Sequence, residues 1–260
     1  MSEKLTDAPI FYTIGQIRFN PVLSISDYVP KIHERIRKQF PAVRQEDLRR
    51  IQLNFAGQEN KDPVTTFSAP RWSFTDTKNT SGYMLYTDSL VFHTTAYETS
   101  KEFFEALLKG LELVDETVGL SYVDSVGLRT LDAIVPSEGR PLDFYLNRQV
   151  LGFHGLIDGD LKHNITESVS MLPTGQRVSR VVILHGTIGT PVDLFPISLT
   201  LAQKFQKLNS LHAILDFDHS NQQRFDFDLD EVESRVLEVK QALTRVFKSV
   251  VTQQALETWQ

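Results

Sequence analysis

Residues 89–135, SLVFHTTAYETSKEFFEALLKGLELVDETVGLSYVDSVGLRTLDAIV, decide the fold of this chain. The first part, as far as Ala96, is rich in apolar and β-branched residues and is typical of a short β-strand. Ser100 then precedes a segment whose apolar residues recur at helical spacing, so it is a candidate helix cap. The run from Tyr122 to Val135 predicts a long second strand.

The residues before this stretch predict a strand, a helix and several short strands. Apolar residues alternate on both faces of Ile10–Phe19, and apolar residues at helical spacing follow as far as Phe40, before Pro41. The polar stretch Gly57–Ala69 is predicted to be a loop. The other predicted strands are Ile51–Phe55, Arg71–Thr75, Gly82–Thr87 and Ser89–Ala96.

After residue 121 a similar order of elements begins again. The long strand is followed by a short helical pattern at Pro141–Asn147. The remaining predicted elements are a hairpin of Ile165–Leu172 and Val178–Gly186, a helical pattern within Pro191–Leu208, a strand at Leu211–His219 and a helix from Leu229 to Thr252.

The whole pattern predicts an α+β protein made of two successive strand–helix–strands–helix units, residues 1–120 and 121–260. The units are expected to share one curved antiparallel sheet backed by helices. No residue-level repeat joins them, so the duplication rests on element order alone. That order resembles the fold of the TATA-binding protein and its relatives, but a likeness of fold does not carry function across.

Composition excludes several classes of function. The 260 residues include no cysteine, which excludes disulfides, thiolate metal sites and cysteine nucleophiles. No apolar run approaches the ~20 residues of a membrane helix, and no secretory signal is visible. The net charge of −6 disfavours non-specific nucleic-acid binding, which needs many basic contacts. We therefore expect a cytoplasmic protein that does not bind membranes.

An acidic segment is the first candidate site. Asp216 and Asp218 are two residues apart on a predicted strand, so both point to one face, and His219 follows. With nearby acids they could hold Mg²⁺ or Mn²⁺. The alternative is a solvated loop in which Asp228 or Asp230 caps the last helix. We favour the cap, which predicts that the protein needs no metal ion.

Arg129 is the second candidate, because it interrupts the apolar strand that begins at Tyr122. An arginine on a central strand needs an acidic or carbonyl partner, or it faces solvent or a ligand. Asp216 and Asp124 could each pair with it, and we predict Asp216 as the partner.

A basic patch lies on and after the first predicted helix, and no catalytic signature accompanies it. The patch could meet nucleic acid or an acidic partner, or it could simply be solvated. The chain contains neither a Gly-x-Ser-x-Gly elbow nor a His-Glu-x-x-His pair, so we predict no catalytic residue and no cofactor. The basic residues are Lys31, Arg35, Arg37, Lys38, Arg44, Arg49 and Arg50.

Four short segments carry a resemblance to a known family: Leu90–Tyr97, Val126–Arg129, Leu215–Asp218 and Val246–Thr252. Together they resemble a sporadically distributed family of uncharacterised bacterial proteins of about this length. Their order and spacing carry the resemblance, which spans most of the chain. Thr130 and Leu131 depart from the aromatic residue and asparagine usual in the family. The resemblance implies a bacterial, cytoplasmic protein and carries over no activity.

The sequence thus predicts a non-enzymatic binding protein that recognises a macromolecular partner, most simply another protein. Two alternatives stay open: a small-molecule binder with its ligand between the sheet and a helix, and a divalent-metal enzyme that uses the region of Asp216 and Asp218. The predicted partner- or ligand-binding residues are Arg129, Asp216, Asp218, His219, Arg35, Lys38 and Arg49.

Overall fold

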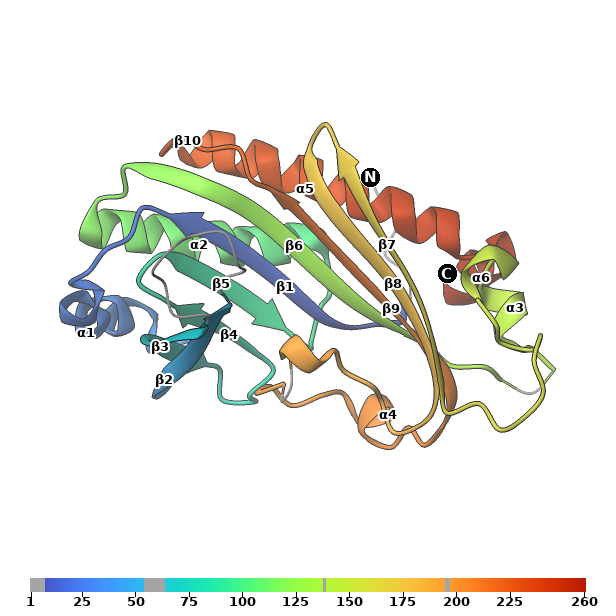
Figure 1. The fold of residues 1–260 in the computed structure, drawn as a ribbon. Helices are drawn as coiled ribbons and strands as arrows, with labels where there is room; N and C mark the ends of the chain where they lie inside the picture. Colours follow the sequence, from blue (N-terminus) through green and yellow to red (C-terminus); the bar gives the residue numbers. More distant parts are fainter. Residues whose placement is uncertain (1–7, 54–63, 138, 195–196) are drawn as a thin grey trace.

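The computed structural model describes residues 8–53, 64–137, 139–194 and 197–260, and they form an α+β fold (Figure 1). Ten strands make one large antiparallel sheet backed by helices, which confirms the predicted class. The strands are β1 (Ile10–Phe19), β2 (Ala42–Leu53), β3 (Val64–Thr75), β4 (Ser81–Leu85), β5 (Ser89–Thr94), β6 (Tyr122–Ile134), β7 (His163–Leu172), β8 (Gly175–Gly186), β9 (Ser210–Asn221) and β10 (Phe225–Asp226).

The strand order across the sheet is β2-β3-β4-β5-β1-β6-β9-β8-β7, and β10 pairs with the start of β6. The pair β1–β6 therefore lies at the centre, while β2 and β7 form the two edges. Every pairing is antiparallel. The predicted long strand and the predicted hairpin are confirmed as β6 and as β7–β8.

One face of the sheet packs against the helices, and this helix side holds the main core. Figure 1 shows α2 and α5 lying along this face. Phe19, Leu128 and Phe217 point into the core from three of the strands, and Leu111 and Val239 meet them from α2 and α5. The helices are α1 (Ile25–Ile36), α2 (Ser100–Val118), α3 (Leu142–Tyr145), α4 (Gln203–Gln206), α5 (Leu229–Val250) and α6 (Gln253–Trp259).

A segment that we call the strap, residues 187–194 and 197–209, lies on the other face of the sheet. Leu199 and Phe205 of the strap pack on Phe11 and Ile214 of the strands. The Oγ1 hydroxyl of Thr95 donates a hydrogen bond to the Thr200 carbonyl at 2.6 Å, which holds the strap against the first half of the chain. The strap therefore covers part of the face opposite the helices, which we call the strap side.

The helix predicted within Pro191–Leu208 is wrong over most of its length. The strap contains only the 3-10 turn Val192–Leu194 and the short helix α4. Its apolar residues are spaced as on a helix, but they are buried individually against the strands. Helical spacing of apolar residues therefore did not indicate a helix here, because the packing surface is a sheet that the segment crosses.

The predicted loop Gly57–Ala69 and the predicted start of the second strand are also wrong. β2 begins at Ala42 rather than Ile51, and β3 begins at Val64; residues 57–63 and Phe55 lie outside the described residues. The two strands pair along their whole length, from Ala42 opposite Thr75 onward. Backbone hydrogen bonds hold the pair β2–β3 together. Such a pair forms without an alternation of apolar residues, so the sequence pattern did not reveal the full length of the two strands.

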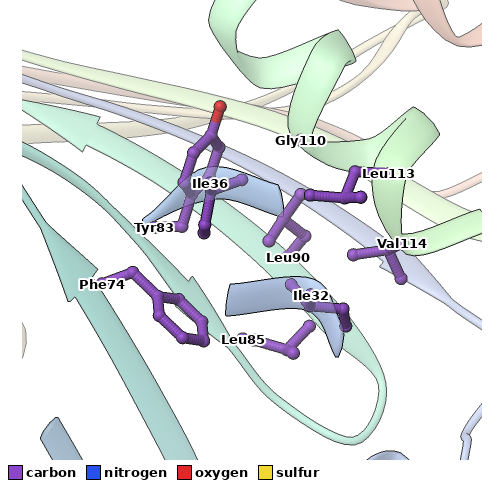
Figure 2. Close-up of a pocket in the computed structure, with 9 residues that line it drawn as sticks. All are labelled: Ile32, Ile36, Phe74, Tyr83, Leu85, Leu90, Gly110, Leu113 and Val114. Carbon is purple, nitrogen blue, oxygen red and sulfur yellow. The ribbon is translucent and has the colours of Figure 1, made fainter. Parts of the chain in front are cut away.

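Close packing between α2 and the sheet gives a first prediction. Figure 2 shows Gly110 of α2 beside the ring of Tyr83, and a Cβ atom on Gly110 would lie 2.4 Å from Tyr83 Cε1. The ring cannot easily move, because the Tyr83 hydroxyl donates to the Ala106 carbonyl at 2.6 Å. Gly110→Ala should lower the free energy of unfolding by about 1 kcal/mol, after the gain in helix propensity is counted.

Denaturant unfolding of Gly110→Ala in two backgrounds checks this prediction. In a Tyr83→Leu background the obstructing ring is gone, so the same alanine should leave stability unchanged or raise it. Stabilisation of the otherwise wild-type chain by Gly110→Ala would contradict the packing described.

Candidate functional site

Three of the predicted residues meet on the strap side of the sheet. β6 and β9 pair so that Arg129 lies opposite Asp218 and Leu131 lies opposite Asp216. The neighbouring residue Phe217 points into the core on the helix side. Because side chains alternate along a strand, Arg129, Asp216 and Asp218 all point to the strap side.

Arg129 and Asp216 form a buried, bidentate ion pair. Nε of Arg129 donates to Oδ1 of Asp216 at 2.7 Å, and Nη2 donates to Oδ2 at 2.9 Å. Only 1% of Asp216 is exposed. The predicted pairing is therefore confirmed, and the rejected alternative, Asp124, instead accepts a hydrogen bond from Nε of Arg224 at 2.7 Å.

Residues from three further elements complete this ion-pair network. Arg129 also donates to Asp193 of the strap, with Nη2 at 3.3 Å from Oδ1. Arg180 of β8 donates through Nη1 to Oδ2 of Asp216 at 3.2 Å and pairs through Nε with Glu167 of β7. The network therefore joins the strap to four strands, β6, β9, β8 and β7.

Sequence reasoning missed Asp193, Arg180 and Glu167. The predicted hairpin contained a signal for two of them, because counting back from the turn at Leu172 and Gly175 places Glu167 opposite Arg180. Asp193 had no comparable signal, since the path of the strap follows from tertiary packing.

The electrostatics of the network favour the charged forms of the paired groups. Burial opposes the charge of Arg129, but hydrogen bonds to Asp216 and Asp193 outweigh it and raise the pKa of Arg129. Burial also acts on Asp193, yet its hydrogen bond with Arg129 lowers the pKa of this carboxyl. Burial raises the pKa of Asp218, with Arg129 acting in the opposite sense.

Asp218 differs from Asp216 in having no counter-ion of its own. Among the described residues its carboxylate takes part in no hydrogen bond and no ion pair, although Arg129 lies opposite it on β6. Arg129 is already engaged with Asp216 and Asp193. Asp218 is therefore a partly buried acid that remains open to an additional cation.

Three apolar residues of the edge strand β7 point away from the core on the helix side. Ile165, Val169 and Met171 are 58%, 57% and 77% exposed and point to the strap side. The alternate positions point to the helix side, and all but the last of them, Leu172, are polar: Asn164, Thr166, Ser168 and Ser170. The strand therefore presents its apolar face to solvent.

This apolar face continues toward the ion-pair network. Val169 lies opposite Val178 of β8, and Val178 lies opposite Asp218 of β9. We call Ile165, Val169, Met171, Val178 and Asp218 the open face. It is a strip on the strap side of the sheet that combines apolar side chains with one unpaired carboxylate.

The structure places His219 away from the other acidic-segment residues. Its neighbours Asp218 and Phe217 point to opposite sides, and His219 shares the helix side with Phe217. The His219 side chain is fully buried, and its Nε2 atom lies 3.0 Å from Oγ1 of Thr174. Burial lowers the pKa of His219, which favours the neutral form of the ring.

The basic residues do not form one helical surface. Arg35 of α1 is half exposed and forms an ion pair with Glu116 of α2, while Lys38 is exposed just after α1. Arg49 lies on β2 opposite Ser68, and its side chain is outside the described part of the structure. The predicted patch is therefore divided between α1 and the edge strand β2.

The acidic residues after β9 cap a helix, as favoured from the sequence. Oδ1 of Asp228 accepts a hydrogen bond from the Glu231 backbone N–H at 3.0 Å, and Asp230 lies in the first turn of α5. Within the described ranges no three His, Asp or Glu side chains are placed to hold a metal ion together. The oxygens of Asp216 accept from guanidinium groups, which is a poor environment for a divalent cation.

Two hollows bear on the small-molecule alternative. The cavity between α1, α2 and the sheet has a volume of only about 10 Å³, and Figure 2 shows its apolar lining. A single water molecule needs about that much room, so no ligand fits there. A larger groove of about 460 Å³ lies beside α3, and its lining includes Leu142, Arg148 and Leu156.

Comparisons with known proteins identify no family for this chain. No protein-family model matches it, and a search of curated proteins returns no significant match. No helix in the described residues is long and apolar enough to cross a membrane. The function is therefore inferred from the site itself.

Proposed function

We propose that this chain is a non-enzymatic binding protein that recognises another protein through the open face. The observation that carries the proposal is the reversed alternation of β7, which exposes Ile165, Val169 and Met171. A strand with one solvated face normally turns its polar residues outward. Contiguous exposed apolar patches, especially when polar residues surround them, mark interaction sites.

The position of β7 at the edge of the sheet supports this assignment. Within the described residues β7 pairs with β8 alone, so one side of its backbone is free to accept hydrogen bonds. An extended segment of a partner can be added to such an edge while its side chains cover the exposed apolar ones. The open face therefore offers both backbone and side-chain contacts.

The charge of this region favours a protein over a nucleic acid. The network that adjoins the open face contains more carboxylates than guanidinium groups, and the chain as a whole has a net charge of −6. Nucleic-acid binding depends on basic groups that neutralise phosphates. The same network argues against an enzyme, because its arginines and aspartates are engaged with one another.

We further propose that the two halves of the chain are related in the manner of the TATA-binding protein. The support is the strand order, in which β1 and β6 pair at the centre and each is followed by further strands and a long helix on the helix side. This relation concerns the scaffold, and the binding proposal does not depend on it.

Two aspartates on the open face should abolish partner binding. Val169→Asp combined with Met171→Asp places charge on the surface that a partner covers, and we expect affinity to fall by more than about 30-fold. Both side chains are exposed, so the free energy of unfolding should change by less than about 1 kcal/mol. A partner is first captured with the wild-type chain from the cells in which this protein naturally occurs. Its affinity for each variant is then measured with purified proteins.

The control is Leu237→Asp on α5, an apolar residue on the helix side that is 42% exposed. This variant should bind the partner as the wild type does. Equal binding by the Val169→Asp/Met171→Asp variant and the wild type would contradict the proposal, and so would loss of binding only in the Leu237→Asp variant.

A further inference from the structure

The registers of four neighbouring strands place an acid within reach of whatever covers β7. Arg129, Asp218, Val178 and Val169 lie in one row across β6, β9, β8 and β7. Adjacent strands are ~4.8 Å apart, so Val169 and Asp218 are separated by about 10 Å. One side of a helix or a single extended segment spans that distance and can touch both residues.

The charges beside this row do not balance. Asp193, Asp216, Asp218 and Glu167 carry four carboxylates, and Arg129 and Arg180 carry two guanidinium groups, which pair with three of these acids. Each arginine is shared between two of the acids, and Asp218 is left over. The surface that adjoins the apolar part of the open face is therefore short of positive charge.

A partly buried carboxylate without a counter-ion gains most from a cation that arrives with a partner. Burial raises the pKa of Asp218, and the nearby charges of Arg129 and Arg180 offset this effect only in part. Covering the open face would remove the remaining water from Asp218 and increase the free-energy cost of ionising its carboxyl. A cation supplied by the partner would offset the cost and fix the register of the complex.

We infer that the partner presents a basic and apolar surface, with a lysine or arginine against Asp218 and apolar side chains over Val169 and Met171. This inference rests on the proposed function and specifies the chemistry of the partner. Acidic segments and phosphates are excluded by the same charges. A second copy of this chain is disfavoured as the occupant, because two open faces would bring Asp218 and Glu167 of both copies together.

Selection from a library of random peptides displayed on phage tests the inference. The full chain is immobilised, and peptides that still bind the Val169→Asp/Met171→Asp variant are discarded. The remaining peptides should be enriched in lysine or arginine next to apolar residues. Their affinity should fall roughly tenfold for Asp218→Asn, and added salt should weaken binding to the wild type more than to this variant.

Glu233→Gln is the matched control, since Glu233 is an exposed acid of α5 on the helix side. It should leave the affinity unchanged. A double-mutant cycle then tests direct contact: the basic residue of a selected peptide is changed to glutamine, alone and together with Asp218→Asn. The two changes together should weaken binding no more than either does alone.

The outcomes separate the inference from the proposed function. Selected peptides without basic residues, or additive effects in the cycle, would overturn the role of Asp218 and leave the open face as a docking surface. Failure to select any peptide that depends on Val169 and Met171 would overturn both. Strong self-association of the chain, abolished by the Val169→Asp/Met171→Asp variant, would replace the basic partner by a second copy.

Discussion

Replacing Arg129 with leucine is expected to lower the free energy of unfolding by about 3–5 kcal/mol. The substitution leaves the carboxylate of Asp216 buried with a single remaining ion-pair partner, Arg180, at 3.2 Å. It also removes the contact that ties Asp193 of the strap to the sheet. Denaturant unfolding monitored by circular dichroism measures the loss.

Two controls separate the buried pair from the exposed one. The double variant Arg129→Leu/Asp216→Leu removes both buried charges and should recover most of the lost stability. Asp193→Asn should cost less than about 1 kcal/mol, because Asp193 is 63% exposed at its side chain and screened by solvent. An Arg129→Leu variant as stable as the wild type would show that the network does not hold the sheet and strap together.

The second large effect is expected at Asp132, where the stability of the protein should depend on pH. Asp132 lies on β6, is 5% exposed and forms no hydrogen bond or ion pair through its carboxyl within the described residues. Burial raises the pKa of this group to about 7. In the unfolded chain the same carboxyl has a pKa of about 3.9.

The sign of the effect follows from these two pKa values. The folded chain retains the proton between about pH 4 and pH 7 while the unfolded chain loses it, so ionisation favours unfolding. The stabilising contribution of Asp132 is therefore complete below about pH 4 and is lost as the pH rises to about 7. Asp132→Asn removes the dependence and should be more stable than the wild type at pH 8, by on the order of 4 kcal/mol.

Urea unfolding of the wild type and Asp132→Asn at several pH values tests this expectation. The stability difference between the two should be small at pH 4 and should grow up to pH 8. Glu233→Gln, which changes an exposed acid, should show no such trend. A difference for Asp132→Asn that is constant with pH would mean that Asp132 ionises in the folded chain as it does in the unfolded chain.

The buried ion pair was predictable because it depends on the period of a strand and on charge alone. Alternation places Asp216 and Asp218 on one side of β9, and an arginine in an apolar strand requires a partner. The same alternation separates His219 from them, although the sequence pattern grouped the three together. Local rules of this kind succeed when both partners lie on regular strands.

The rest of the site depends on which elements lie next to each other, and sequence patterns do not contain that information. Asp193 reaches Arg129 because the strap crosses the sheet. The apolar residues of the strap are spaced as on a helix, so the sequence pattern did not indicate this path. The alternation of β7 is visible in the sequence, with apolar residues at Ile165, Val169 and Met171. This alternation indicates an exposed apolar surface only once β7 is known to be an edge strand that the strap does not cover.

Thiol labelling inside the producing cells tests the central claim, that a partner covers the open face, most directly. The chain has no cysteine, so Met171→Cys and Leu237→Cys each introduce a single reactive thiol at an exposed position. In the purified protein both positions should react rapidly with a membrane-permeant maleimide. In cells, position 171 should be strongly protected while position 237 still reacts; equal reaction of the two positions in cells would contradict the account.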